Sequence, residues 1–378
     1  MMKIIRATTV PESLDTFCKG MLRALSEKYE VIALSSPGQE LETVRQREGV
    51  RVISVPMERR ISPQKDLVSL WQLVKAFRKE KPTMVHSMTP KAGLLCMVAA
   101  WMARVPVRVH TFTGLVFPTS TGLKRRILML TDTVTCACAT HIIPEGEGVK
   151  HDLMYYGITR KPMRVLGYGN VRGVDMAVYD RRPAVLELAR PIRQKDCFTF
   201  LFVGRILRDK GIDELVTAFD TLSREDATVR LLLVGKYENH LDPISSASEA
   251  LIHQNPAIMA VGSQSGDELL AYYAATDCFV LPSYREGFPN TVLEAGAMGL
   301  PCIVTDINGS REIIREGENG VIIPSKNTEA LYQAMKTMRN DPIAREKMAS
   351  NARKMIADRF EQGFVRKCLY DYYDEILP

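Results

Sequence analysis

Hydrophobic residues along this chain alternate between short continuous runs and longer amphipathic stretches. In the first half, short apolar runs predict strands at residues 3–7, 29–35, 50–55, 84–87 and 107–111, with 140–143 and 164–166 as further candidates. Amphipathic stretches predict helices at residues 14–28, 67–80 and 91–103. Strands that alternate with helices form a parallel sheet covered by helices, so the first half predicts one α/β domain.

The second half repeats this alternation after a segment, residues 167–195, that is rich in Gly, Asp, Arg and Pro and reads as a linker. Strands are predicted at residues 199–203, 230–234, 257–260, 278–281, 301–304 and 320–323. Helices are predicted at residues 212–222, 267–275, 291–298, 310–316 and 328–340. The chain of 378 residues therefore predicts two doubly wound, Rossmann-like domains, residues 1–170 and 171–361.

Composition fits a globular protein, with 46% hydrophobic and 25% charged residues. The most apolar run, residues 92–103, is too short to span a bilayer and predicts a buried helix instead. The eight cysteines are scattered without a zinc-binding spacing, and the N-terminus leads directly into a strand pattern rather than a signal peptide. We therefore expect a cytoplasmic protein with reduced thiols.

Charge is divided unevenly between the two halves. Residues 1–170 hold 25 Lys and Arg against 14 Asp and Glu, whereas the remainder holds 25 against 30. A basic N-terminal domain suits the anionic inner face of a membrane, although an ordinary solvated basic surface gives the same pattern. Nucleic acid is not an expected partner, because no aromatic and basic recognition motif accompanies the charge.

A polar loop between a strand and a helix carries candidate chemistry in the second half. The apolar strand ends at Pro282, and Pro289 with Asn290 suits the start of the next helix. The first turn of a helix offers free N–H groups and the positive end of its dipole to an anion such as phosphate. Glu286 in the loop and Glu294 two turns along the helix offer acceptors for sugar hydroxyls. The segment therefore predicts a ligand that is part sugar and part phosphate.

A second loop, after the strand at residues 199–203, is basic. Gly204 lets the backbone approach a ligand, Arg205 can bind two phosphate oxygens, and Lys210 adds a further positive charge. Alone, this loop also fits a solvated basic turn.

Four segments in order resemble the group 1 family of retaining, nucleotide-sugar-dependent glycosyltransferases, which have the GT-B fold. Residues 201–211 resemble the V-G-R…K-G loop, and Glu286 to Glu294 is the E-x7-E signature. Residues 299–306 and 319–324 resemble the two strands that follow it in the family. The resemblance implies that a C-terminal helix within residues 362–378 crosses back to the N-terminal domain.

The resemblance implies that residues 171–361 bind the donor and residues 1–170 the acceptor. Arg205 and Lys210 are then expected to hold the donor diphosphate, Glu286 the transferred sugar and Glu294 the ribose. The donor-binding set also includes Gly204 and the segment at the helix start, namely Gly287, Phe288, Asn290 and Thr291. Residues 235–239, 262–264 and 284–285 are expected to select the base and the sugar.

His110 ends the strand at residues 107–111, where similar enzymes carry a histidine that faces the reacting sugar, so it is a catalytic candidate; His86 is a weaker one. The chain departs from many relatives in residues 7–13, which lack a Gly-Gly pair. Either the hydroxyls of Thr8, Thr9 and Ser13 replace its contacts with the donor, or this loop faces the acceptor.

The expected reaction transfers a hexose or N-acetylhexosamine, with retention, from a UDP-sugar to a polyprenyl-diphosphate-linked saccharide in capsule or lipopolysaccharide synthesis at the inner membrane. No cofactor or metal is expected, because no D-x-D motif is present and Arg205, Lys210 and the helix start supply positive charge. Two alternatives stay open at this point. One is a nucleotide-sugar 2-epimerase, and the other is a non-catalytic, nucleotide-sugar-binding partner subunit.

Overall fold

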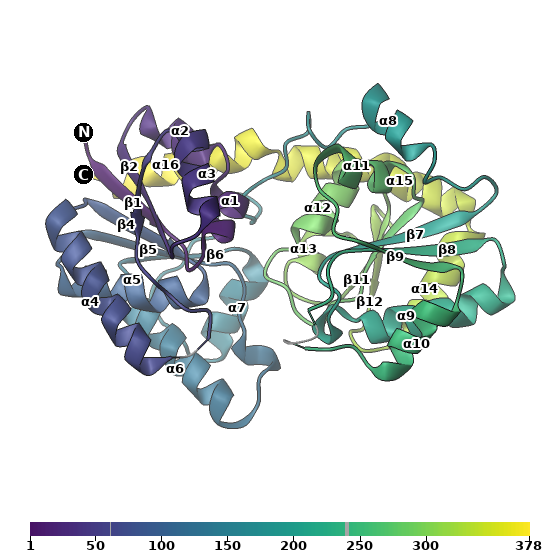
Figure 1. Ribbon diagram of the computed structural model, residues 1–378, viewed down its shortest axis with the longest axis horizontal. Helices are drawn as coiled ribbons and strands as arrows, with labels where there is room; N and C mark the ends of the chain where they lie inside the picture. Colours follow the sequence, from purple (N-terminus) through teal and green to yellow (C-terminus); the bar gives the residue numbers. More distant parts are fainter. Residues whose placement is uncertain (61, 239–241) are drawn as a thin grey trace. The chain divides into compact units, whose positions relative to one another are not determined.

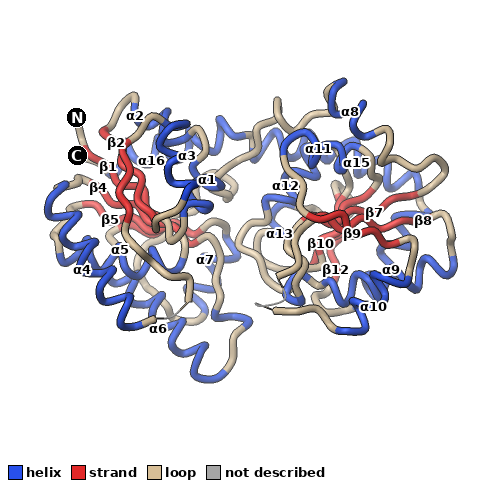
Figure 2. The backbone as a smooth tube through the Cα atoms, viewed as in Figure 1, coloured by secondary structure: helices blue, strands red, loops and turns tan. Residues whose placement is uncertain are grey.

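Each half of the chain folds around a parallel sheet that has helices on both faces (Figures 1 and 2). The computed structural model describes residues 1–60, 62–238 and 242–378. These residues form two compact units, one of residues 1–173 with 363–378 and one of residues 174–362. The break therefore lies three residues after the boundary that the sequence predicts.

The sheet of the N-terminal unit has the order β3-β2-β1-β4-β5-β6, and its strands pair in parallel. The strands are β1 (Lys3–Ala7), β2 (Glu30–Ser35), β3 (Arg51–Ser54), β4 (Met84–Met88), β5 (Val107–Phe112) and β6 (His141–Pro144). The order reverses direction between β1 and β4, as in a dinucleotide-binding fold, and this switch point is where such sheets bind ligands.

Helices cover the two faces of this sheet and enclose two separate apolar cores. The helices are α1 (Pro11–Cys18), α2 (Met21–Ser26), α3 (Gln39–Glu48), α4 (Pro63–Glu80), α5 (Pro90–Met102), α6 (Gly122–Cys138), α7 (Glu147–Tyr155) and α16 (Gln362–Ile376), with a 3-10 turn at Phe117–Thr119. One core contains residues of α4, α5 and α6, and the other contains residues of α1, α2, α3 and α16.

The sheet of the C-terminal unit has the order β12-β11-β10-β7-β8-β9, which repeats the same topology. The strands are β7 (Phe198–Val203), β8 (Val229–Val234), β9 (Ile258–Gly262), β10 (Cys278–Leu281), β11 (Cys302–Thr305) and β12 (Gly320–Ile323). Most of their side chains are buried on both faces, as expected for a parallel sheet between two helical layers. The switch point here lies between β7 and β10.

Helices also cover both faces of the second sheet and pack on one continuous apolar core. The helices are α8 (Pro183–Ala189), α9 (Ile212–Glu225), α10 (Ser246–Gln254), α11 (Gly266–Ala274), α12 (Asn290–Ala297), α13 (Ser310–Ile313), α14 (Thr328–Asn340) and α15 (Pro342–Phe360), with a 3-10 turn at Arg208–Lys210.

Three predicted elements of the fold differ from the structure. The helix expected at residues 14–28 is two helices, because Gly20 adopts a left-handed conformation with φ of 73° and ends the first. Residues 164–166 form no strand, and only Met163 makes a single bridge to β6. The helix expected at residues 310–316 already ends at Ile313.

The linker at residues 167–195 contains a helix, α8, that its composition did not predict. Among the described residues, no helix is both long and apolar enough to cross a membrane. All eight cysteines are free thiols.

Candidate active site

The basic loop after β7 lies against the loop after β8. The Gly204 amide donates to the Val234 carbonyl at 2.9 Å, and a Cβ on Gly235 would lie 1.8 Å from the Gly204 oxygen. This close approach needs a glycine at position 235. Arg205 is half exposed beyond this contact and pairs with Glu238 at 3.0 Å. Asn239, the last residue of the loop expected to select the donor, lies outside the described residues.

The loop after β10 is fixed to the 3-10 turn at Arg208–Lys210 by several contacts. The Tyr284 amide donates to the Asp209 carbonyl at 2.9 Å, and Arg285 pairs with the Asp209 carboxylate at 2.9 Å. Gly211 has a φ of 71°, and a Cβ there would lie 2.1 Å from the Pro282 carbonyl oxygen. The two loops at the switch point therefore form one packed unit.

This packing brings together two of the predicted site residues. Lys210 Nζ lies 2.5 Å from Glu286 Oε1, and both side chains are mostly buried. An ion pair of this kind fixes the position of each side chain and leaves the second carboxylate oxygen of Glu286 as an acceptor. The sequence places these residues 76 positions apart, and the fold places them at the carboxyl ends of neighbouring strands.

The start of α12 supplies backbone donors, as the sequence predicts. Pro289 is the N-cap, so the Asn290 and Thr291 amides lie in the first turn, where helical N–H groups have no partner within the helix. The Phe288 side chain is buried and packs on Phe360, with a 5.4 Å ring separation, so only its backbone can meet a ligand. The backbone of Gly287 is in turn closely packed by Gly309, whose Cβ would lie 2.4 Å from the Gly287 oxygen.

Glu294 is an interior residue of α12 with a relative exposure of 5%. The Tyr273 hydroxyl donates to Glu294 Oε2 at 3.2 Å. Burial first, and the Glu294 charge second, raise the pKa of Tyr273 well above its usual value, so Tyr273 stays a hydrogen-bond donor at neutral pH. Glu294 is therefore not an ordinary exposed glutamate of a surface helix, because its carboxylate is held inside the helical layer.

His110 lies near the carboxyl end of β5, as predicted, but it is buried. Its Nδ1 lies 2.9 Å from the Ser87 hydroxyl, and its ring occupies the space that a side chain at position 93 would need. A Cβ on Gly93 would lie 2.4 Å from the ring, so this glycine makes room for the histidine on α5. Burial lowers the pKa of His110 to about 3, so the ring is neutral at neutral pH.

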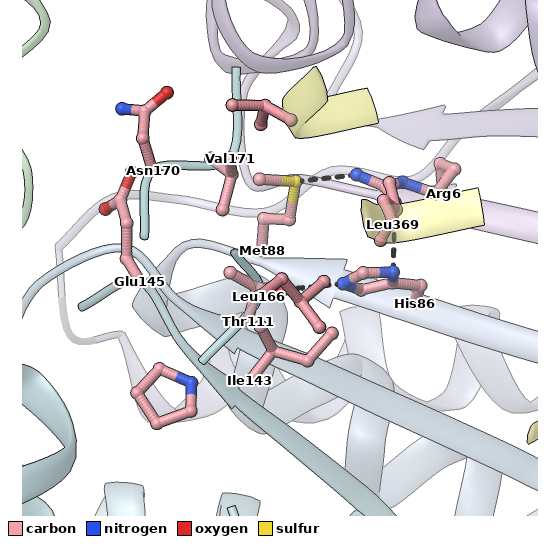
Figure 3. A pocket seen from close by; sticks show the side chains of 12 residues that line it. Arg6, His86, Met88, Thr111, Ile143, Glu145, Leu166, Asn170, Val171 and Leu369 are labelled. Atoms are coloured by element: carbon pink, nitrogen blue, oxygen red, sulfur yellow. Dashed lines mark hydrogen bonds between the residues drawn. The ribbon is translucent and has the colours of Figure 1, made fainter. Parts of the chain in front are cut away.

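His86 faces the side of the sheet opposite to His110, because His110 pairs with Ser87 and the side chains of His86 and Ser87 point to opposite faces. It lies in a small cavity with Arg6, Met88 and Thr111, as Figure 3 shows. Arg6 is buried and contacts His86 Nδ1 at 2.9 Å, Met88 Sδ at 3.0 Å and the Tyr373 hydroxyl at 2.5 Å. This cluster links α16 to β1 and β4. The only sign of this cluster in the sequence is that a charged residue, Arg6, stands inside an apolar strand.

The loop at residues 7–13 uses two of its hydroxyls inside the fold. Thr9 Oγ1 lies 2.8 Å from Thr89 Oγ1 and accepts from the Ala92 amide, while the Thr8 hydroxyl donates to the Val10 carbonyl at 2.9 Å. Both threonines are buried. The Thr9 hydroxyl holds the loop to the start of α5, and the Thr8 hydroxyl bonds within the loop itself. Whether the loop meets the donor or the acceptor stays a prediction.

Comparison with known proteins gives two family matches that together cover most of the chain. The family of glycosyl transferases group 1 matches residues 188–355, and a glycosyl transferase 4-like domain matches residues 15–169. The capsular polysaccharide biosynthesis glycosyltransferase CapM of Staphylococcus aureus is 31% identical over 99% of this chain and 97% of its own length. An Escherichia coli UDP-Gal:alpha-D-GlcNAc-diphosphoundecaprenol alpha-1,3-galactosyltransferase is 27% identical over 83% of this chain and 81% of its own.

Two solved structures show the same fold over nearly the whole chain. Anabaena HepE, solved in complex with UDP, superposes with a TM-score of 0.82 at 17% identity, over 99% of this chain and all of HepE. WaaG, a glycosyltransferase involved in lipopolysaccharide biosynthesis, superposes with a TM-score of 0.73 at 15% identity, over 97% and 98% of the two chains. The predicted fold, two Rossmann-like units of the GT-B class, is confirmed. The chain belongs to the group 1 glycosyltransferases.

Proposed function

We propose that this enzyme transfers a hexose or N-acetylhexosamine from a UDP-sugar to a polyprenyl-diphosphate-linked saccharide, with retention of anomeric configuration. The observation that carries the proposal is the Lys210–Glu286 pair at the switch point of the C-terminal sheet, next to the start of α12. Positive charge, backbone donors and a carboxylate acceptor are the groups that a sugar diphosphate needs.

The proposed nucleotide and the proposed acceptor are supported by the substrates for which relatives of this chain are named. The Escherichia coli relative is named for UDP-galactose and an acceptor linked to diphosphoundecaprenol. A Campylobacter jejuni relative, 23% identical over 97% of this chain, is named for a diphospho-undecaprenol acceptor as well. CapM supports a role in capsular or related polysaccharide synthesis. We propose that the protein works in the cytoplasm, at the inner face of a membrane that holds such a lipid.

In the proposed mechanism, the developing charge on the UDP leaving group is stabilised by Arg205, Lys210 and the amides at the start of α12. Glu286, fixed by Lys210, accepts hydrogen bonds from hydroxyls of the transferred sugar, and Glu294 accepts them from the ribose. The acceptor oxygen attacks from the face that UDP leaves, and the departing phosphate oxygen takes the acceptor proton. A neutral His110 is then a candidate hydrogen-bonding partner for the sugar rather than a cation.

We propose that no metal ion takes part, since these positive groups already provide the charge that a metal supplies in other enzymes. Among the described residues, no three His, Cys, Asp or Glu side chains are grouped as metal ligands. Rates measured with and without EDTA test this point, and a rate that EDTA abolishes and Mg²⁺ restores would contradict it.

The transfer itself is tested with a panel of UDP-sugars and a short-chain polyprenyl-diphosphate saccharide. Proton NMR of the product reports the anomeric configuration. We expect one UDP-sugar to give an α-linked product from the α-linked donor. Inversion would contradict the retaining mechanism, and conversion of a UDP-sugar without any acceptor would instead support an epimerase.

A further inference from the structure

The outer face of α4, α5 and α6 is apolar and basic where a globular surface is normally polar. These helices are neighbours on one face of the N-terminal sheet, with α5 between the other two (Figure 1). Six large apolar side chains on α4 and α6 are between 36% and 72% exposed, namely Leu67, Val68, Trp71, Leu123, Ile127 and Leu130. We call these six residues the apolar stripes.

The positions of these residues follow the helical repeat on the solvent side, so their exposure is a property of the fold. On α6, Leu123, Ile127 and Leu130 are spaced by four and three residues and form a single stripe. On α4, Leu67 and Val68 lie one turn before Trp71. The opposite sides of both helices, including Leu73 and Phe77 of α4, fill the core. Isolated exposed apolar residues are ordinary, but grouped ones mark an interaction site.

Positive charge accompanies the apolar stripes. Lys75, Arg78 and Lys79 continue the exposed side of α4, and Lys124 and Arg126 flank the stripe of α6. Within the described part of the chain, none of these five forms an ion pair. The α4 carboxylates are neutralised elsewhere, because Asp66 pairs with Lys91 and Glu80 pairs with Lys3 and Arg51. The carboxylate of α6, Asp132, is half-buried, so the exposed charges of this face are positive.

We propose that this face docks on an anionic phospholipid membrane, with the apolar stripes inserted at the level of the headgroups. Helices that combine large apolar residues, tryptophan and basic side chains lie in the membrane interface, and long basic side chains reach the lipid phosphates from there. The inference rests on the proposed function, since a polyprenyl-linked acceptor keeps its lipid in the bilayer and the enzyme must come to it.

Vesicle flotation tests the face directly. Wild-type protein is mixed with vesicles of equal parts phosphatidylcholine and phosphatidylglycerol, and with vesicles of phosphatidylcholine alone. We expect flotation with the anionic vesicles, lowered about tenfold or more in the double variant Leu123→Gln, Leu130→Gln. The matched control, Leu186→Gln with Leu188→Gln, removes two exposed leucines of α8 in the other unit and leaves flotation unchanged. Equal flotation of the two double variants would overturn the proposal.

The tryptophans provide a second readout, because the chain has only two, Trp71 and Trp101. In the variant Trp101→Phe, all tryptophan emission comes from Trp71. We expect anionic vesicles to move this emission to shorter wavelength, and lipids brominated on their acyl chains to quench it. An unchanged emission from protein that floats would overturn the insertion of this face.

Two further measurements separate other outcomes. If the face joins two copies of the chain instead, sedimentation would show that wild type is a dimer and that the double variant Leu123→Gln, Leu130→Gln is a monomer. Wild type would then not float with vesicles, which overturns the proposal. Stabilisation by UDP is measured on the same samples. Flotation without stabilisation by UDP would contradict the proposed function and leave the docking face standing, whereas stabilisation without flotation would contradict docking alone.

Discussion

Lys210 and Glu286 determine each other's position in the candidate active site. Both are mostly buried, and their atoms lie 2.5 Å apart, so removal of one leaves the other without its charged partner inside the protein. Arg205 differs, because it is half exposed and its partner Glu238 lies at the surface. In our account, Lys210 is therefore a preformed part of the site, whereas Arg205 has to leave Glu238 to meet a phosphate.

Replacement of Lys210 should affect the chemical step more than binding. We expect Lys210→Ala to lower kcat by about 100-fold or more, the loss typical of one preorganised electrostatic group. Steady-state kinetics with the preferred UDP-sugar measures it. The matched control is Arg208→Ala, an exposed basic residue two positions away, which should stay within about twofold of wild type. Wild-type turnover in Lys210→Ala would contradict the role.

His110 predicts a pH dependence of stability. Its folded pKa of about 3 lies below its ordinary value of 6.5, so between these values the unfolded chain binds a proton that the folded chain does not. The contribution of neutral His110 to the free energy of unfolding is complete above pH 6.5. It is lost as the pH falls, by up to about 1.4 kcal/mol per pH unit. The free energy of unfolding, measured in urea, should depend less steeply on pH in His110→Gln than in wild type. The control His151→Gln replaces an exposed histidine and should leave this pH dependence unchanged.

At this scale, the sequence predicts the residues that lie in motifs and misses those that meet only through the fold. Arg205, Lys210, Glu286 and Glu294 follow from local patterns beside strand ends. The contact of Arg6 with Tyr373 joins residues 367 positions apart, and no local pattern indicates it. The burial of Glu294 is likewise set by the layer around α12, which a single helix pattern does not reveal.

At the scale of elements, the 3-10 turn at Arg208–Lys210 depends on the glycine that follows it. Gly211 has a positive φ and lies against the Pro282 carbonyl. We expect Gly211→Ala to lower the free energy of unfolding by about 1–3 kcal/mol, from backbone strain and the clash together. The control Gly317→Ala has a φ of 70° but nothing within 4 Å of its Cβ, so it measures strain alone. Equal losses in urea unfolding would show that the packing of the two loops is not tight.

Element prediction succeeds where apolar residues form a continuous run, as in the strands, or one clear side of a helix, and it fails where neither pattern is clear. The strands and α14 are read correctly because their apolar residues face a core. The sequence misses α6, and one reason is that Leu123, Ile127 and Leu130 are apolar on the solvent side and obscure its periodicity. The same three residues belong to the proposed membrane-docking face. The apolar side chains that hide α6 in the sequence are therefore also those proposed to enter the membrane.

For the whole molecule, the C-terminal helix α16 completes the N-terminal unit, as the family resemblance implies. The Tyr373 hydroxyl of α16 accepts from the Arg6 guanidinium and also hydrogen-bonds to His86 Nδ1, and all three residues are buried. We expect Tyr373→Phe to lower the free energy of unfolding by about 1–3 kcal/mol, because a buried guanidinium loses a partner. The control Tyr155→Phe changes an exposed tyrosine and should have no effect. A stable Tyr373→Phe protein would contradict the role of this cluster.

The division into two units could be predicted because the order of strands and helices repeats along the chain. The position of residues 363–378 could not be predicted from periodicity, which gives an amphipathic helix but not its partner. Only the family resemblance indicated where this helix packs. The helices α3, α10 and α15 were also missed, and their sequences are rich in charged or polar residues with a weak apolar side.

The central claim is that the groups at the β7–β10 switch point bind a nucleotide diphosphate. Calorimetric titration of UDP into wild type and Glu294→Gln tests it most directly, with the unfolding curve of each protein as the check on folding. We predict binding by wild type and an affinity at least about tenfold weaker in the variant, since the charge-assisted hydrogen bonds of a ribose to a carboxylate are replaced by weaker ones to a neutral amide. Equal affinity in the two proteins, or no binding by wild type, would contradict the account.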